Sequence, residues 1–527
     1  MRKILFVLLL ISAGFVTPAF ALDRAAVDKL AFGDSEEKIE AIGALVAEGD
    51  PKALTLLSAL LEGELQTLPA TKRVLIVKGE RAIDAVTGEQ VVPTPAERDD
   101  ILVNNRLRGA LNDALAALKL VSQDRAVRLA AAKELDGSAD ATMLPLVKKA
   151  LAQEADTGVR ALLESIVATA EINGDDKPVR LMALRTLERS GTAGTKTLLL
   201  TLLEKETDED IRSAAQQSLR AIEGRLAWGE RAGLLFSGIS LGSVLLLAAL
   251  GLAITYGLMG VINMAHGELI MVGAYTTYVV QNLFRTYLPN AFDWYLLCAV
   301  PTAFAMAGLV GMALERSVIR WLYGRPLETL LATWGISLVL MQSARTIFGA
   351  QNVPVENPAF MSGGIQILSN VVLPWSRIVI IFFAIAVVIG VWLLLTRTRL
   401  GLFVRGVTQN RAMASCVGVP TARVDAWAFG LGSGIAGLAG CALSQIGNVG
   451  PDLGQAYIVD SFMVVVLGGV GQLIGTVYAA LGLGFANKLL ESWSGAVLAK
   501  IVVLVFIIIF IQKRPQGLFA LKGRAVE

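Results

Sequence analysis

Histidine and cysteine are scarce in this chain, and charge is scarce in its second half. Among 527 residues there are one histidine, His266, and three cysteines, Cys298, Cys416 and Cys441. The cysteines stand far apart, with neither the spacing of a metal site nor the even number of a disulfide framework, so we interpret them as small buried side chains. The net charge of +2 gives no argument for nucleic acid as a partner.

Apolar side chains are what the sequence has in abundance. They make up 54% of the chain against 17% charged residues, a balance typical of membrane proteins. The charge is dense before about residue 225 and sparse after it. A chain of this length is not expected to form one compact core. We therefore treat the charged part and the apolar part separately.

The first residues have the pattern of an export signal. Arg2 and Lys3 precede an apolar run from Ile4 to Val16, and Ala19-Phe20-Ala21 offers the small residues of an A-x-A cleavage site. The pattern predicts a signal peptide over residues 1–21, cleaved after Ala21. The alternative, a short signal anchor, has an apolar core too short to span a membrane comfortably. The following residues are then expected outside the cytoplasm.

A recurring motif, Asp-x-x-[Val/Ile]-Arg, predicts a soluble helical domain over residues 22–225. It begins at Asp124, Asp156, Asp176 and Asp208, with intervals of 32, 20 and 32 residues. Asp is a favourable helix N-cap. The apolar stripe expected after the third motif comprises Val179, Met182, Ala183 and Leu187. Helices with one apolar face must stack to bury it, and the pattern resembles HEAT-type repeats despite its uneven middle interval.

Two further features of this domain bear on its role. Residues 73–77 are an arginine followed by four apolar residues, three of them β-branched, and the turn-rich residues 87–89 come later, which predicts a small β insertion. The domain has no histidine and no catalytic constellation. Its expected role is docking of another extracytoplasmic protein, and a passive domain is the alternative.

From about residue 232 onward, apolar segments of spanning length recur. We predict spans near residues 235–258, 262–282, 295–318, 328–348, 376–396, 426–446 and 498–512. Alternation from an outside start places the arginines of 319–327 and 397–425 inside, as the positive-inside rule requires. A cytoplasmic C-terminus then requires an even number of crossings from 459–490. That stretch is interrupted at Gly468–Gly471, so it either crosses twice or re-enters on one side.

Small residues at four-residue spacing mark one of these spans. Gly432, Ala436 and Gly440 form one row, and Gly430, Gly434 and Gly437 lie in a second. Such rows favour close helix packing.

One predicted span carries polar residues that a lipid-facing helix would not tolerate. Asn263, His266 and Glu268 interrupt an otherwise apolar sequence. A charge at the bilayer centre costs about 2.5–3.5 kcal/mol even on the mildest scale. Either these residues line a translocation pathway, or they form a polar cluster that holds helices together or lies near the membrane interface.

A second polar stripe lies at Thr329, Thr333 and Ser337, which share one helix face at i, i+4 and i+8. Hydroxyls in such positions often bond only the carbonyl four residues earlier in their own helix. If the stripe instead lines a path, its donors and acceptors suit a small neutral polar solute.

The long loop over residues 397–425 carries the last motif. Residues from Gln409 to Cys416 are expected to form a short helix that ends before Gly418 and Pro420 and presents Ala412 and Ala414 for close contact. A short rigid helix on the cytoplasmic side is what a partner protein could push. The alternative is a basic loop that only fixes orientation.

Together, these stretches resemble the permease family of branched-chain amino acid and urea-type ABC importers. The resemblance covers essentially 232–524 and lies in Gly257–Glu268, Gly324–Gly335, Arg405–Gly418, Val466–Gly471 and Arg514–Phe519. It implies an all-α, polytopic transmembrane permease domain after an exported HEAT-like domain. It also implies that Asn263–Glu268 shapes the pathway. The loop would be a coupling helix that docks on ATPase subunits, a role carried by Arg405, Gln409, Asn410, Ala412, Ala414 and Gly418.

The resemblance also sets the expected assembly. The resemblance implies that this chain binds no cofactor and is not an enzyme, because ATP would be hydrolysed on two separate cytoplasmic ATPase subunits. A second permease subunit completes a heterodimer, and an extracytoplasmic solute-binding protein delivers the solute. The complex is expected in the bacterial inner membrane. Because ordinary amino-acid permeases of the family lack a large exported domain, we expect the urea-type branch, with branched-chain amino acids or short amides as the alternative. A passive solute channel and a membrane-anchored scaffold are more distant alternatives.

Overall fold

The computed structural model describes residues 23–48, 51–68, 71–79, 81–92, 95, 98–136, 143–260, 262–368 and 370–519. The predicted signal peptide, 1–21, lies outside this part. The chain divides into two compact units, Met1–Ala227 and Trp228–Glu527. The longest helix, α11 (Glu209–Met259), contributes residues to both. Each unit is described by itself below.

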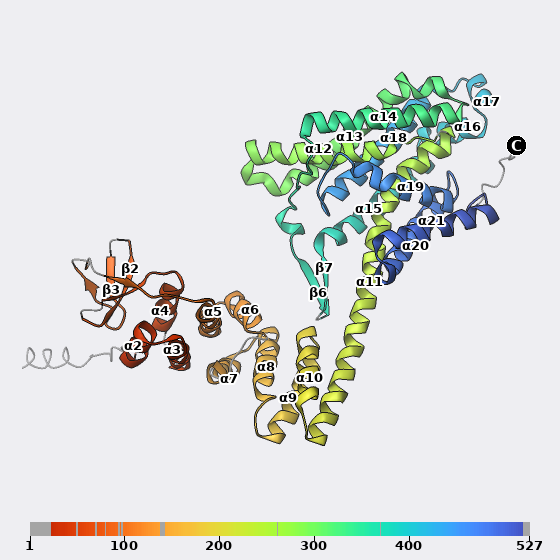
Figure 1. Cartoon of the computed structure of the whole chain (residues 1–527). Helices are drawn as coiled ribbons and strands as arrows, with labels where there is room; N and C mark the ends of the chain where they lie inside the picture. The colour runs from red at the N-terminus through yellow and green to blue at the C-terminus, as the bar shows by residue number, and fades with distance from the viewer. Residues whose placement is uncertain are drawn as a thin grey trace, which may run out of the picture. The chain divides into compact units, whose positions relative to one another are not determined.

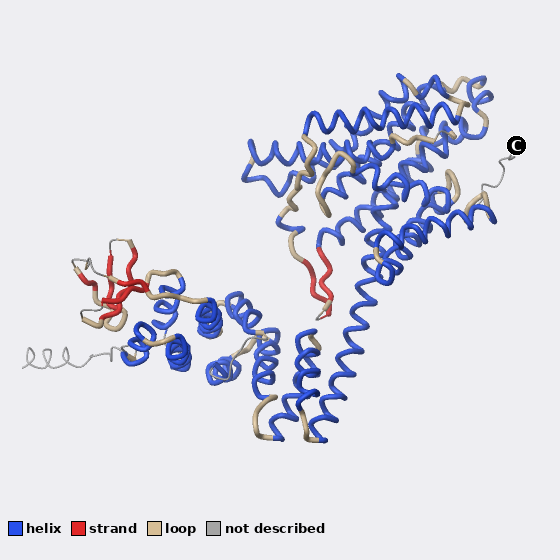
Figure 2. The backbone as a smooth tube through the Cα atoms, in the orientation of Figure 1, coloured by secondary structure: helices blue, strands red, loops and turns tan. Residues whose placement is uncertain are grey.

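The first unit combines helices with one small sheet (Figures 1 and 2). Its helices are α2 (Arg24–Phe32), α3 (Ser35–Glu48), α4 (Pro51–Leu61), α5 (Asn105–Lys119), α6 (Arg125–Leu135), α7 (Leu144–Gln153), α8 (Thr157–Glu171), α9 (Lys177–Ser190) and α10 (Ala193–Lys205). Its strands are β1 (Leu65–Leu68), β2 (Arg73–Lys78), β3 (Arg81–Asp84), β4 (Gln90–Val91) and β5 (Asp99–Asp100), in the order β4-β3-β2-β1-β5. The expected β insertion over residues 73–77 is confirmed as β2.

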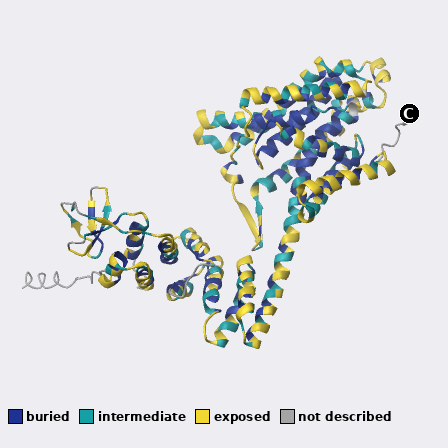
Figure 3. Ribbon diagram, viewed as in Figure 1, coloured by how far each residue is buried: buried dark blue, intermediate teal, exposed yellow. Residues whose placement is uncertain are grey.

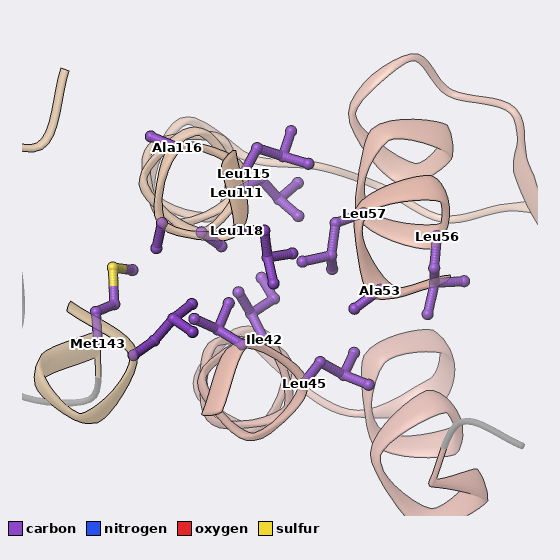
Figure 4. Packing of buried hydrophobic residues seen from close by; sticks show 14 of the residues in the cluster. Ile42, Leu45, Ala53, Leu56, Leu57, Leu111, Leu115, Ala116, Leu118 and Met143 are labelled. Atoms are coloured by element: carbon purple, nitrogen blue, oxygen red, sulfur yellow. The ribbon is translucent and has the colours of Figure 1, made fainter. Parts of the chain in front are cut away.

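Among its described residues this unit has two hydrophobic clusters, one along α8–α11 and one that includes the meeting of α3, α4 and α5 (Figure 4). Ile42 and Leu45 of α3 face Leu57 of α4 and Leu111 and Leu118 of α5, and all are almost completely buried. On α5 the apolar side chains recur at helical spacing, so they share one face.

The motif aspartates act as helix caps in three of four cases. The side chain of Asp124 accepts a hydrogen bond from the Ala126 N–H group, and the side chains of Asp156 and Asp208 cap α8 and α11 in the same way. Asp176 precedes α9 without such a bond, and Pro178 occupies the second position of that helix. Proline cannot donate a backbone hydrogen bond, which removes one of the N–H groups that an N-cap pairs with.

The uneven spacing of the motif comes from a longer repeat. Arg128 pairs with Glu154, and Arg180 pairs with Glu206. Both residues of the second pair lie 52 positions after their counterparts in the first. Arg125 with Asp156 and Lys177 with Asp208 repeat at the same offset. The repeating unit therefore holds two copies of the motif, 32 residues apart.

The stripe expected on α9 is partly wrong. Ala183 and Leu187 are buried, but Val179 and Met182 are 37% and 72% exposed. Leu184 is buried in their place. Leu184 and Leu187 are three residues apart and share a face with Ala183, whereas Met182 is rotated about 200° away from Leu184.

The second unit is a set of long helices with one hairpin (Figure 1). Its helices are the later part of α11, α12 (His266–Tyr287), α13 (Tyr295–Ser317), α14 (Pro326–Phe348), α15 (Trp375–Arg397), α16 (Arg399–Gln409), α17 (Arg411–Cys416), α18 (Thr421–Ser444), α19 (Leu453–Gly468), α20 (Leu473–Ser494) and α21 (Ala496–Lys513). The short helical turns η2 (Pro289–Trp294), η3 (Ile319–Leu322) and η4 (Ala359–Met361) and the strands β6 (Gly364–Leu368) and β7 (Val371–Pro374) connect them.

Seven helices within the described residues are long and apolar enough to cross a membrane. They are the apolar part of α11 and the helices α13, α14, α15, α18, α20 and α21. The helix α12 is not among the seven, although its 22 residues would reach across. It is packed against α13 and α18; α18 is largely buried (Figure 3), and α12 is buried over its first part and exposed over its last turns.

The apolar stretch 459–490 is divided into two helices by a glycine turn. A side chain at Gly469 would collide with the backbone of Phe519, and a side chain at Gly257 of α11 would collide with the backbone of Gly471. The Leu518 N–H group donates to the Leu467 carbonyl at 2.8 Å. From this turn α20 runs antiparallel along α11, with Leu481 beside Gly242 and Phe485 beside Gly238. The helix α20 is one of the seven candidate spans, whereas α19 has 16 residues and is shorter than a span requires.

The small-residue rows of α18 pack as the sequence predicts. The row containing Gly432 and Gly440 contacts α11 and α12, where added side chains would meet Gly251 and Ile270. The row containing Gly434 and Gly437 contacts Phe304 and Ala303 of α13. Glycine therefore lets α18 approach three helices closely.

Candidate functional site

The candidate pathway begins at a break between α11 and α12. Gly260 follows α11 with φ of +64°, a left-handed conformation that favours glycine. Asn263 holds the break in place, because its Oδ1 accepts a hydrogen bond from the Ala265 N–H group at 3.0 Å. The helix resumes at His266, so the polar residues of the predicted span lie at and just before a helix N-terminus.

The histidine is bonded to the neighbouring helix. Its Nε2 lies 3.0 Å from the Ala248 carbonyl oxygen of α11 and must donate, because a carbonyl only accepts. Nδ1 is then the acceptor nitrogen, and it has no hydrogen-bond partner among the described residues. His266 is fully buried.

The two polar stripes expected from the sequence meet in space. Ser337 of α14 donates to the Glu268 carboxylate of α12 at 2.9 Å. One turn earlier on α14, the Thr333 hydroxyl accepts from the Met264 N–H group at 3.2 Å. Sixty-nine residues of sequence separate the partners in each pair. We call Asn263, His266, Glu268, Thr333 and Ser337 the polar cluster.

Thr329 lies outside this cluster. Its hydroxyl donates to the Arg325 and Leu322 carbonyls at 2.8 and 3.0 Å. Thr333 also donates to the carbonyl four residues earlier, at 2.8 Å. Thr329 therefore bonds only carbonyls of nearby residues in the sequence, whereas Thr333 bonds both its own helix and Met264, and Ser337 bonds Glu268 across helices.

Five buried polar atoms, at the helix break and along α12, have no protein partner within the described part of the chain. They are Asn263 Nδ2, His266 Nδ1, Glu268 Oε2, Tyr275 Oη and Gln281 Nε2. A buried polar group without a partner costs about 1–3 kcal/mol, so a concentration of them indicates groups that pair with water or a solute.

The sequence reading missed Tyr275 and Gln281. Tyr275 lies two helical turns after Glu268, on the same face of α12, and this spacing could have identified it. It is stacked on Phe348 of α14 with ring centroids 4.3 Å apart. Gln281 accepts from the Glu356 N–H group at 3.3 Å, a contact with a distant loop that no local pattern signals.

A second helix N-terminus meets the first at this place. Gly267 and Gly454 are the second residues of α12 and α19, and their backbones touch so closely that a side chain on either would collide. Helix N-termini carry partial positive charge. The two N-termini meet at the backbone of Gly267 and Glu268, and the Glu268 carboxylate has one oxygen without a partner among the described residues.

The loop element consists of two helices where one was expected. The predicted helix from Gln409 to Cys416 is divided at Asn410, which ends α16 and caps α17. The Asn410 Oδ1 accepts from the Met413 N–H group at 2.9 Å. Asparagine favours the N-cap because its side chain satisfies a free backbone donor. Gly418, with φ of +87°, follows α17.

The expected coupling residues differ in accessibility. Arg405, Gln409, Asn410, Ala412 and Gly418 are exposed. Ala414 is buried in a cluster with Val404, Val407, Val424 and Ala428, so it packs inside its own chain. Of the two alanines expected to present themselves for contact, the structure exposes only Ala412.

The geometry defines a class of protein: a multi-pass helical membrane protein with a polar cluster at a helix break and an exposed short helix, α17, between α15 and α18. Within the described residues, no three His, Cys, Asp or Glu side chains are grouped to hold a metal ion. Residues 234–511 match the family model described as "Branched-chain amino acid transport system / permease component". The chain belongs to this family, which identifies it as a permease subunit of an ABC importer and a multi-pass inner-membrane protein.

Curated relatives agree with this assignment. The chain is 27% identical over 288 residues to the high-affinity branched-chain amino acid permease protein BraD of Pseudomonas aeruginosa, covering 54% of this chain and 94% of BraD. It is 27% identical over 291 residues to LivH of Escherichia coli K12, covering 54% and 94%. A probable LivH of Methanocaldococcus jannaschii is 24% identical over 298 residues, covering 52% and 88%. No solved structure matches the chain significantly.

Proposed function

We propose that this subunit carries urea, or a closely related amide, through an ATP-driven importer by alternating access. The solute would pass the polar cluster, with Thr329 one turn away. The observation that carries the proposal is the Ser337–Glu268 hydrogen bond, which joins α14 to α12 among buried polar atoms without partners. Such atoms offer both donors and acceptors to a small planar amide.

The helical unit before the permease part favours urea over branched-chain amino acids, because ordinary amino-acid permeases of the family lack a large exported domain. BraD and LivH align over 94% of their length yet account for only 54% of this chain. The helical unit up to Ala227 precedes the matched range 234–511 and is not part of what they share. Branched-chain amino acids are the second candidate, and the names of these relatives favour them.

The proposed assembly contains a second permease subunit, two cytoplasmic ATPase subunits and an extracytoplasmic solute-binding protein. We place the N-terminal HEAT-like unit outside the cytoplasm and the loop 397–425 and the C-terminus inside, in accordance with the arginines of the loop. The contact with the ATPase subunits would be made by Arg405, Gln409, Asn410, Ala412 and Gly418. The buried Ala414 would hold α17 against the rest of this chain.

Reconstitution tests the proposal directly. The complete complex is placed in liposomes with the binding protein, and uptake of labelled urea is measured with ATP and with a non-hydrolysable analogue. ATP-dependent urea uptake supports the proposal. Urea uptake that is the same with ATP and with the analogue contradicts an ATP-driven importer and favours a passive channel.

The role of the N-terminal unit has a separate test. Residues 22–225 are deleted behind the retained signal, and association of the binding protein with the complex is measured. We expect weaker association. Unchanged association would eliminate a docking role and leave the alternative of a passive domain.

A further inference from the structure

We propose that Arg411 is the positioning residue through which movement of α17 reaches the membrane helices α13 and α18. The inference rests on the proposed function, because it assumes that ATPase subunits act on α17. Arg411 is the first residue of α17. Its guanidinium pairs with the Asp425 carboxylate in the first part of α18 and lies over the Tyr323 ring, 4.7 Å from the centroid.

A second ion pair extends this contact to α13. The Tyr323 hydroxyl donates to Glu315 Oε1 at 3.3 Å, and Arg320 of η3 lies 3.6 Å from the other oxygen of the same carboxylate. Glu315 belongs to the last turns of α13. One guanidinium on α17 therefore connects, through one aromatic ring, to the cytoplasmic ends expected for two spans.

Burial makes this connection costly to break. The side chains of Asp425 and Glu315 are 5% and 1% exposed. A buried carboxylate that loses its cation is strongly disfavoured, so Arg411 and Asp425 are expected to move together rather than separate. The flat guanidinium also fits the face of Tyr323, which a lysine ammonium does not reproduce.

The helix α17 has few other attachments that could transmit a displacement. It has six residues, and Ala414 is its one buried side chain. Arg405, Gln409 and Ala412, which we assign to the ATPase contact, are exposed. Arg411 thus lies on an exposed helix and pairs with a buried carboxylate. A residue that transmits a displacement needs both an accessible helix and a buried partner.

The path continues from α18 to the polar cluster. Gly437 and Gly440 of α18 lie against Gly273 and Ile270 of α12, with no room for a side chain between the backbones. Close-packed helices of this kind transmit displacement because they cannot deform at the contact. The helix α12 carries Glu268 two residues after its start. A shift of α17 would therefore act on the helix that bears the pathway residues.

The test separates coupling from assembly. Complexes carrying Arg411→Gln, Asp425→Asn or both are reconstituted in full, and three quantities are measured: co-purification of the ATPase subunits, ATP hydrolysis, and uptake of labelled urea. Arg399→Gln is the matched control, because Arg399 begins the neighbouring helix α16, is exposed and has no ion pair among the described residues.

For Arg411→Gln we expect intact co-purification and retained ATP hydrolysis, with uptake per ATP reduced about ten-fold. Asp425→Asn should behave likewise, and the double variant should be no worse than the worse single variant, because both remove one contact. Arg411→Lys should restore part of the coupling, since it keeps the charge but loses the stacking.

Three outcomes would overturn the inference. Unchanged uptake per ATP in Arg411→Gln would exclude a transmitting role. Loss of the ATPase subunits would make Arg411 a docking residue. An equal loss of uptake per ATP in Arg399→Gln would show that removing any positive charge from this loop has the same effect. If the unmodified complex hydrolyses ATP but moves neither urea nor leucine, the proposed function fails instead, independently of these variants.

Discussion

The hydroxyl of Ser337 on α14 and the carboxylate of Glu268 on α12 are joined by a hydrogen bond of 2.9 Å inside the helical bundle. This bond satisfies one carboxylate oxygen, while the second has no partner among the described residues. The pair therefore links two helices, and one oxygen of the carboxylate has no hydrogen-bond partner in the described part of the chain.

Removing the Ser337 hydroxyl should impair transport. Ser337→Ala leaves a buried carboxyl oxygen of Glu268 without its donor, and a buried acceptor without a partner costs about 1–3 kcal/mol. We expect solute uptake to fall about ten-fold at unchanged protein level. The control is Ser343→Ala on the same helix, because that hydroxyl donates to the Val339 carbonyl of its own helix at 2.7 Å. Equal uptake by the two variants would contradict a role of the Ser337–Glu268 hydrogen bond in transport.

A methyl group on the α18 glycine row should destabilise the membrane unit. In Gly440→Ala the added carbon would collide with the Ile270 carbonyl of α12. Overpacking of this kind costs about 1–3 kcal/mol. We expect a lower melting temperature of the detergent-solubilised complex. Gly482→Ala on α20 is the matched control, since nothing lies within 4 Å of its added carbon. If both variants melt like the unmodified protein, the close packing has been overstated.

The repeated ion pairs of the first unit should be equivalent. Arg128→Ala leaves Glu154, whose side chain is 2% exposed, without its guanidinium, which should cost about 3 kcal/mol of local stability. Arg180→Ala, one repeat later, should cost about as much because Glu206 is left in the same way. Hydrogen exchange of helices α7–α10 in the full chain measures both. Arg160→Ala breaks an exposed pair with Glu164 and should change little. A clear difference between the first two variants would argue against a structural repeat.

The first unit should lose order in acid. The Arg125 side chain, and then the Val159 N–H group, lower the pKa of Asp156 to about 2. An unfolded Asp has a pKa of about 3.9. The stabilising contribution is therefore complete above that pKa and is lost as the pH falls from about 4 to 2. Hydrogen exchange of residues 154–160, corrected for intrinsic rates, should show protection falling over this window. Arg125→Gln should move the loss to higher pH, and an unchanged profile would contradict the assignment.

The sequence could predict most of the helices and one half of the site. Apolar run length located the spans, and the small-residue spacing of α18 identified its packing, because both depend only on local composition. Glu268 and Ser337 were each identified as candidates for the same reason. Their hydrogen bond could not be predicted, since it depends on how α12 and α14 pack across 69 residues of sequence.

Other features were hidden for related reasons. Val179 was expected in the core, but the buried face of α9 includes Leu184 and is therefore centred further round the helix than Val179. Asn410 divides a helix that periodicity alone makes continuous, because its side chain caps α17. Arg411 has the sequence context of any basic loop residue. Its pairing with Asp425 appears only when α17 lies against α18.

Uptake in cells tests the central claim most directly. Labelled urea and labelled leucine are supplied in parallel at low concentration under nitrogen limitation, to cells with and without this gene, before and after ATP depletion. Loss of ATP-dependent urea uptake in the deletion strain, with leucine uptake unchanged, is the predicted result. Loss of leucine uptake alone would keep the importer and replace its solute. Urea uptake that requires the gene but survives ATP depletion would contradict an ATP-driven importer.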